Sequence, residues 1–298
     1  MDIFLERLFD GVTNGAVYAI MAMALVVVFR GTGTINFAQG EMALFTTYIA
    51  WWLTVQGQPV WVAAIIASAV GFVLGAVTER TLIRPIRKRN DMATLIVALG
   101  LFTGFNALAG LIWNSENKNM PSLFPAGQDD YATVGGARLY FDALGVWLVV
   151  ILLIGAVFFL FNRTRIGLHM RAVADNPESA ALTGVKTGRI LMLGWGLAGI
   201  IGSFAGVLIA PLSSQQLGLT TMFPILIYAS AAALFGGLDS PVGAVVGGLA
   251  IGLLEAMITG YVDFVGGTLP QTAALVIIVF ILLFKPTGLF GTRQMERL

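Results

Sequence analysis

The sequence predicts an all-α membrane protein, a single polytopic helix bundle over residues 1–298 with about eight to ten transmembrane segments. Of its residues, 57% are hydrophobic and only 11% are charged, whereas soluble domains carry roughly 25% charged residues. Apolar runs near the ~20-residue bilayer length recur along the chain. These runs are continuously apolar rather than alternating, which favours membrane-spanning helices over a β-barrel.

Polar residues separate nine apolar segments. If successive loops lie on opposite sides of the membrane, these segments make nine crossings. The segments lie at residues 12–29, 41–56, 60–78, 92–113, 143–161, 190–210, 223–237, 242–260 and 269–284. The segments at 41–56 and 223–237 are short and flanked by glycine, so a re-entrant or broken helix is the alternative at either place. Glycines four residues apart, as at Gly71 and Gly75, predict close packing between helices in lipid.

Basic residues predict the orientation of the bundle. Five Lys or Arg residues crowd into residues 80–91, where Pro85 ends a helix, and five more lie in residues 163–189. Further basic residues close the chain: Lys285, Arg293 and Arg297. The positive-inside rule puts these three segments in the cytoplasm, with the N-terminus outside and the C-terminus inside.

The loop at residues 114–142 is then external, and its composition fits that side of the membrane. It carries four acidic residues and two basic ones: Glu116, Asp129, Asp130, Asp142, Lys118 and Arg138. With this orientation, only Arg7, Lys118 and Arg138 of the 17 Lys and Arg residues fall outside the cytoplasm. We therefore expect an external loop at 114–142 and a cytoplasmic loop at 163–189.

Residues for covalent chemistry are scarce, so we expect a transport subunit rather than an enzyme. The chain has no cysteine and a single histidine, His169, too few for a metal centre or a Ser-His-Asp triad. The nearest match to a phosphate-binding loop, around Lys186, lacks the glycine before the lysine. Glu41 and Glu255 are the ionisable residues of the apolar segments. A functional site and a hydrogen bond to a neighbouring helix are open alternatives for Glu255.

The polar loop at 163–189 contains the pattern of a short capped helix. Asn176 suits the N-cap, Pro177 the first helical position and Glu178 the positive end of the helix dipole, and Gly184 suits the left-handed position that ends a helix. We expect the small side chains of Ala180 and Ala181 to lie on the surface of this helix. Docking against another protein and a solvated loop that only sets topology both remain open on these residues.

The same loop resembles a known element. Residues 178–184, E-S-A-A-L-T-G, resemble the E-A-A-x-x-x-G coupling helix of ABC-transporter permeases, and residues 165–185 resemble the cytoplasmic loop of branched-chain amino acid (Liv-type) permeases. The resemblance extends to residues 11–44, to the E-R-x-x-x-R-P-x-R turn that begins at Glu79, and to residues 234–255. The sequence departs from such permeases at Phe29-Arg30-Gly31, where they often have an aliphatic or Tyr-Gly pair.

This resemblance implies a permease subunit of an ATP-driven importer in the bacterial inner membrane, with branched-chain or related hydrophobic amino acids as solutes. Implied partners are two cytoplasmic ABC ATPase subunits, a second homologous permease (LivM-type), a periplasmic solute-binding protein and the lipid bilayer, but no nucleic acid. No cofactor is expected on this chain, because ATP and Mg²⁺ belong to the ATPase subunits. The implied ATPase contacts are Arg171, Asp175, Pro177, Glu178, Ala180, Ala181 and Gly184.

A solute path is expected where polar residues interrupt the apolar segments, because irregular backbone at membrane depth is tolerated mainly beside a cavity. The path candidates are Asn36, Phe37, Gln39, Gly40, Glu41 and Glu255. For Asn36, a helix cap is the equal alternative. Importers of urea, short amides or other amino acids are alternatives within the family, and an ATP-independent secondary transporter or channel is the alternative outside it.

Overall fold

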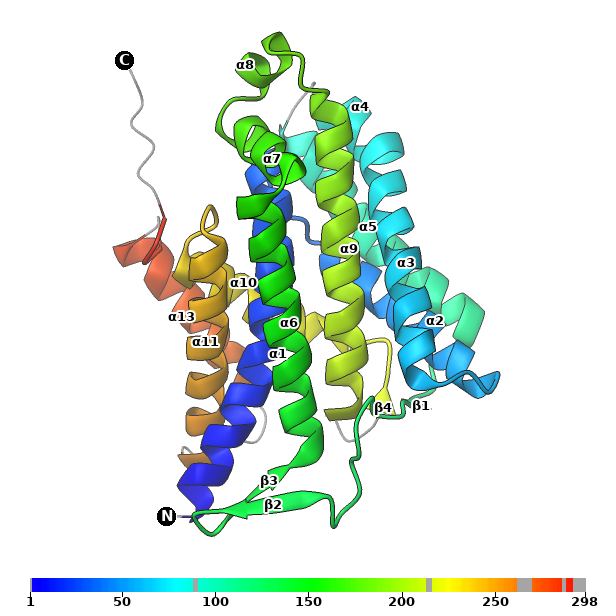
Figure 1. Ribbon diagram of the computed structural model, residues 1–298, viewed down its shortest axis with the longest axis vertical. Coiled ribbons are helices and arrows are strands. Elements are labelled where there is room, and N and C mark those ends of the chain that lie inside the picture. Colours follow the sequence, from blue (N-terminus) through cyan, green and yellow to red (C-terminus); the bar gives the residue numbers. More distant parts are fainter. Residues whose placement is uncertain (1, 88–90, 213–215, 262–269, 286–287, 292–298) are drawn as a thin grey trace.

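A computed structural model describes residues 2–87, 91–212, 216–261, 270–285 and 288–291. Helices dominate it and lie side by side along one long axis (Figure 1). Each of the nine predicted segments coincides with a helix in this part of the chain. These helices are α1 (Asp2–Thr32), α2 (Gln39–Val55), α3 (Val60–Thr78), α5 (Asp91–Trp113), α6 (Phe141–Arg163), α9 (Thr187–Leu212), α10 (Met222–Gly236), α11 (Pro241–Tyr261) and α13 (Pro270–Phe284).

Six helices of the described chain are long and apolar enough to cross a membrane. They span Ile3–Thr32, Val60–Ile86, Met92–Trp113, Phe141–Arg163, Thr187–Leu212 and Pro241–Tyr261. The two segments predicted to be short are α2, with 17 residues, and α10, with 15. At 1.5 Å per residue, α10 extends only about 22 Å, short of the ~30 Å hydrocarbon core. The expectation of short elements at these two places is confirmed.

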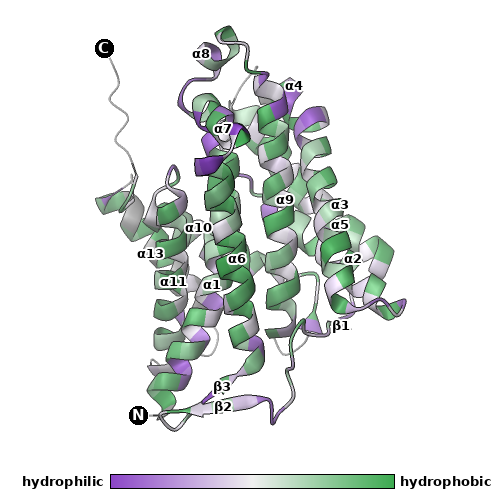
Figure 2. Ribbon diagram, viewed as in Figure 1, coloured by the Kyte–Doolittle hydropathy of each residue, from purple (hydrophilic) through white to green (hydrophobic). Residues whose placement is uncertain are grey.

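The loops gather at the two ends of the bundle (Figures 1 and 2). At one end lie α4 (Arg84–Arg87), α7 (Arg165–Asp175) and α8 (Pro177–Leu182); we call this the basic end. At the opposite end lie the N-terminus and the strands β2 (Tyr131–Val134) and β3 (Ala137–Tyr140); we call this the hairpin end. The two basic loops therefore share one end, as expected. Lys88, Arg89, Arg293 and Arg297 lie outside the described residues.

Helix α1 occupies the centre of the bundle, where it packs against α11, α9, α10 and α6. In its most apolar window 83% of the residues are buried, against 11% in α5. The prediction placed the start of this segment at residue 12, but the helix begins at Asp2. Hydropathy missed the first turns because they contain charged residues, whereas helix formation depends on backbone hydrogen bonds and packing.

Glycines allow the closest helix crossings, as predicted. Gly71 of α3 packs on Gly199 of α9, where an added Cβ would lie 2.6 Å from the Gly199 carbonyl oxygen. Two turns further along α9, a Cβ at Gly206 would overlap the hydroxyl of Thr47 in α2. Because lipid supplies no hydrophobic driving force between helices, this close approach provides the van der Waals contact that holds them together.

Short strands, which were not predicted, organise the hairpin end. Strands β2 and β3 pair antiparallel through the two-residue turn Gly135–Gly136, with both φ angles positive at 60° and 91°. Such a turn suits the twist of a hairpin and favours glycine. A second pair joins β1 (Lys118–Asn119) to β4 (Gln216–Leu217), so the loop after α5 is tied to the segment before α10.

Candidate coupling site and translocation path

The predicted short helix is present as α8, with the predicted caps. The Asn176 side-chain oxygen accepts a hydrogen bond from the backbone N–H of Ser179 at 2.8 Å, and Pro177 occupies the first turn. Gly184 ends the helix at φ +89°, a left-handed conformation that costs glycine little. The Val185 N–H donates to the Ala180 carbonyl at 3.1 Å and closes the last turn. These local hydrogen bonds fix the shape of α8.

A second helix, α7, precedes α8 and was missed in the sequence. Thr164 caps it, since its hydroxyl accepts a hydrogen bond from the Gly167 N–H at 3.1 Å. Its buried residues recur every third position: Gly167, Met170 and Val173. This spacing and the threonine cap are the signals that could have predicted the helix.

Six of the seven predicted ATPase contacts are exposed on α7, α8 and the turn that follows: Arg171, Asp175, Pro177, Glu178, Ala181 and Gly184. The expectation that Ala180 lies on the surface is wrong, because only 4% of this residue is exposed. Ala180 faces inward, since α8 lies against α7 and α9. Leu182, which was not among the predicted contacts, is 90% exposed and is the most exposed large apolar residue of this loop.

Ala180 belongs to a small apolar cluster that seats the loop on the bundle. We call it the satellite cluster; its buried residues are Val27, Phe161, Met170, Val173, Ala180, Ile190 and Leu191. They come from α1, α6, α7, α8 and α9. The loop is therefore packed onto the ends of three long helices.

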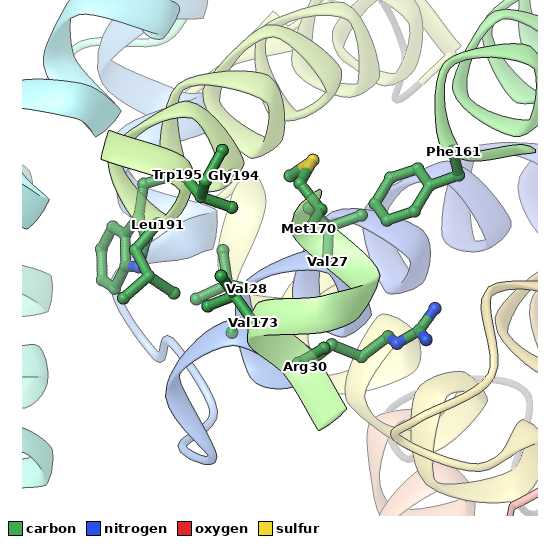
Figure 3. A pocket seen from close by; sticks show the side chains of 12 residues that line it. Val27, Val28, Arg30, Phe161, Met170, Val173, Leu191, Gly194 and Trp195 are labelled. Carbon is green, nitrogen blue, oxygen red and sulfur yellow. The ribbon is translucent and has the colours of Figure 1, made fainter. Parts of the chain in front are cut away.

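A hollow lies beside the satellite cluster, with Trp195 on one side and Met170 and Phe161 on the other (Figure 3). The guanidinium of Arg30 points away from Trp195 and Leu191 (Figure 3). The hollow measures about 20 Å³, which is room for about one water molecule. It is too small for an amino acid and is not a solute site.

The polar break between α1 and α2 is buried and tied to α9. The Asn36 side-chain oxygen accepts a hydrogen bond from the Ala38 N–H at 3.1 Å, which forms an Asx turn just before α2. The alternative that Asn36 caps the helix is wrong, because the N-cap residue is Ala38 and no side chain caps it. The Asn36 amide nitrogen donates to Gln39 at 3.3 Å, and Gln39 in turn donates to the Ala198 carbonyl at 2.9 Å. Asn36, Gln39 and Gly40 are buried, whereas Phe37 is partly exposed.

Glu41 follows this break and is 1% exposed. The side-chain amide of Asn106 in α5 donates to the Glu41 carboxylate at 2.9 Å and to the Leu219 carbonyl at 2.9 Å. Asn106 therefore joins α2, α5 and the segment before α10. Asn106 was not among the predicted path residues, although an asparagine within an apolar segment is itself a signal of such a partner.

Glu255 of α11 has different partners. The Tyr18 hydroxyl donates to its carboxylate at 2.7 Å, and the Tyr18 ring stacks on Tyr228 with centroids 4.9 Å apart. The tyrosines belong to α1 and α10. Glu255 therefore makes a hydrogen bond to a neighbouring helix, which is one of the two alternatives considered. Because Glu41 and Glu255 have separate partners, they do not form a carboxylate pair.

Comparisons with known proteins agree with this architecture. A family model described as the permease component of the branched-chain amino acid transport system matches residues 7–285. The chain is 28% identical to the high-affinity branched-chain amino acid transport system permease protein LivH of Salmonella typhimurium, over 99% of this chain and 97% of that protein. It is also 28% identical to the corresponding protein BraD of Pseudomonas aeruginosa, with 99% and 98% covered.

More distant proteins share the fold or part of the sequence. The ribose import permease protein RbsC of Escherichia coli K12 is 26% identical over 84% of this chain and 77% of that protein. The structure of PsaBC from Streptococcus pneumoniae in complex with Fab superimposes with a TM-score of 0.50 at 15% identity, over 93% of this chain and 91% of that one, and supports the fold alone. From the match over residues 7–285, the chain belongs to the permease family of branched-chain amino acid transport systems.

Proposed function

We propose that the chain is a permease subunit of an ATP-driven importer of branched-chain or related hydrophobic amino acids. The observation that carries the proposal is α8, a capped helix that projects from the basic end (Figure 1). Together with α7 and the turn that follows, it exposes six of the seven predicted contact residues. A multi-pass membrane chain that keeps an ordered polar helix outside its spans has a surface suited to a cytoplasmic partner. The similarity to LivH and BraD supports the choice of solute.

The proposed partners are two ABC ATPase subunits at the basic end, a second homologous permease and a solute-binding protein at the hairpin end. The side chain of Leu182 supplies an apolar anchor for an ATPase groove, and Glu178 of α8 and Arg171 of α7 supply exposed charges. ATP and Mg²⁺ are bound by the ATPase subunits. Closure of these subunits moves α8, and the satellite cluster carries this movement to α1, α6 and α9.

The proposed solute path runs between the two permeases and includes the break at residues 36–41. Phe37 is the partly exposed member of this break, while Asn36 and Gln39 hold its backbone in place. Glu255 is a candidate for a second position on the path, between α1 and α10. A branched-chain side chain needs an apolar route, and the described spans supply mainly apolar surface (Figure 2).

Uptake into proteoliposomes tests the proposal. The importer would be reconstituted with its ATPase subunits, partner permease and binding protein, and radiolabelled leucine uptake measured with and without ATP. We expect uptake with ATP and binding protein together, and none when either is omitted. Equal uptake without nucleotide would instead support a secondary transporter or channel. Titration of the binding protein with leucine, glutamate and urea would identify the solute class.

A further inference from the structure

A buried ion pair lies at the basic end, where α3 continues into α4. The Glu79 side chain is fully buried, and the Arg84 guanidinium donates to it three times, with Nε 3.2 Å from each carboxylate oxygen and Nη2 2.6 Å from Oε2. Arg84 itself is partly exposed, at 33% of its side chain. Because an unpaired buried carboxylate is strongly unfavourable, this geometry fixes the position of Arg84.

A change in helix type lets these two residues meet. Residues Glu79–Ile83 form a π-helical turn, in which the Arg84 N–H donates to the Glu79 carbonyl five residues earlier. In an α-helix of 3.6 residues per turn, residues five apart point in directions about 140° apart. The wider π turn brings them to the same side, and such turns occur frequently at functional sites.

Arg84 also reaches a third partner on another span. Its Nη2 donates to the Gly188 carbonyl at 2.5 Å, in the first turn of α9. A cation at the positive end of a helix is unfavourable by itself, and the negative charge of Glu79 offsets this repulsion. A Cβ on Gly188 would lie 3.1 Å from the Arg84 guanidinium carbon, so the absence of a side chain at Gly188 makes room for the guanidinium.

The position of Gly188 gives this contact its significance. Only residues 183–186 separate the end of α8 from the start of α9, so any movement of α8 reaches the first turn of α9 directly. Further along, α9 packs tightly on α3, with Gly75 against the Trp195 carbonyl. The Arg84 contact extends this attachment of α3 to α9 as far as the basic end, where α8 joins α9.

We propose that Arg84, held by Glu79, is a positioning residue that fastens the first turn of α9 to α3, so that both spans follow α8 as one unit. This inference rests on the proposed function, because it assigns Arg84 a role in transmitting the movement of α8 that follows closure of the ATPase subunits. In this role Arg84 acts through α9 and not on the solute or on ATP. Its loss separates hydrolysis from transport, while the α8 surface that binds the ATPase is left intact.

Four variants of the reconstituted importer test this role. Arg84→Gln removes the guanidinium, and the double variant Glu79→Gln/Arg84→Gln removes both charges and leaves no unpaired buried charge. Arg84→Lys restores a cation, and Arg80→Gln removes a neighbouring exposed arginine that makes no ion pair within the described residues. We expect leucine uptake per ATP hydrolysed to fall at least about fivefold in the first two, less in Arg84→Lys and not at all in Arg80→Gln.

A distance measurement tests the contact itself without any solute. The chain has no native cysteine, so spin labels on Leu82→Cys and Lys186→Cys report the separation of the ends of α3 and α9. We expect a narrow distance distribution that broadens with Arg84→Gln and stays narrow with Arg80→Gln. An unchanged distribution, or an unchanged ratio of uptake to hydrolysis in both Arg84→Gln and the double variant, overturns the proposal. Absence of wild-type uptake contradicts the proposed function instead, and the labels still test the contact.

Discussion

Gly252 of α11 lies directly on Gly15 of α1, so that a Cβ on Gly252 would be 2.3 Å from the Gly15 Cα. Backbone meets backbone at this point, and no side chain can rotate away to make space. The crossing brings α11 against the central helix α1, and it places Glu255 within reach of Tyr18.

Replacement of Gly252 by valine should therefore destabilise the bundle. Overpacking costs about 1–3 kcal/mol in well-packed cores, and more where backbone must move. We expect a lower thermal midpoint in detergent, measured by scanning fluorimetry. Gly100→Val on α5 is the control, because a Cβ there meets nothing within 4 Å. Equal midpoints for both variants would contradict the close crossing.

Asn106→Leu should destabilise the protein because it removes the hydrogen-bond donor from Glu41. A hydrogen bond to a charged group contributes about 1.5–3 kcal/mol, and a buried carboxylate without its partner loses at least that amount. The prediction is a lower thermal midpoint for Asn106→Leu, partly restored by the second change Glu41→Leu. No restoration in the double variant would show that Asn106 acts through Leu219 alone.

The two alanines of α8 should respond differently to the same change. Ala180→Asp puts a charge into the satellite cluster and should lower stability by several kcal/mol, because burying an unpaired charge is costly. Ala181→Asp lies on the exposed side and should leave the thermal midpoint unchanged. The same melting assay on both variants checks this difference, and similar midpoints would contradict the inward orientation of Ala180.

The positions of the helices followed from the sequence because apolar runs and polar loops are local signals. The inward orientation of Ala180 did not, because the satellite cluster draws residues from Val27 to Leu191, which only the folded chain brings together. The partner of Glu41 is 65 residues away, and no local pattern links the two. For α7, charged residues masked the threefold spacing of its buried side chains.

Thiol labelling tests the orientation of the bundle. In intact cells, Pro125→Cys in the loop of the hairpin end should react with a membrane-impermeant maleimide, whereas Ser179→Cys on α8 should react only after the membrane is opened. Both positions are exposed, and the chain has no cysteine of its own to interfere. The reverse pattern would place α8 outside the cell and would contradict cytoplasmic docking.

Docking of the ATPase subunits on α8 can be tested by counting the ATPase subunits that co-purify with the permease. Glu178→Arg reverses a charge on the exposed face of α8, and Asp129→Arg makes the same reversal on an exposed residue of the hairpin end. We expect the Glu178→Arg variant to lose most of its ATPase subunits and to keep its thermal midpoint, and the Asp129→Arg variant to retain them. Full retention by Glu178→Arg, also when Leu182→Glu is added, would show that the ATPase subunits do not dock on α8.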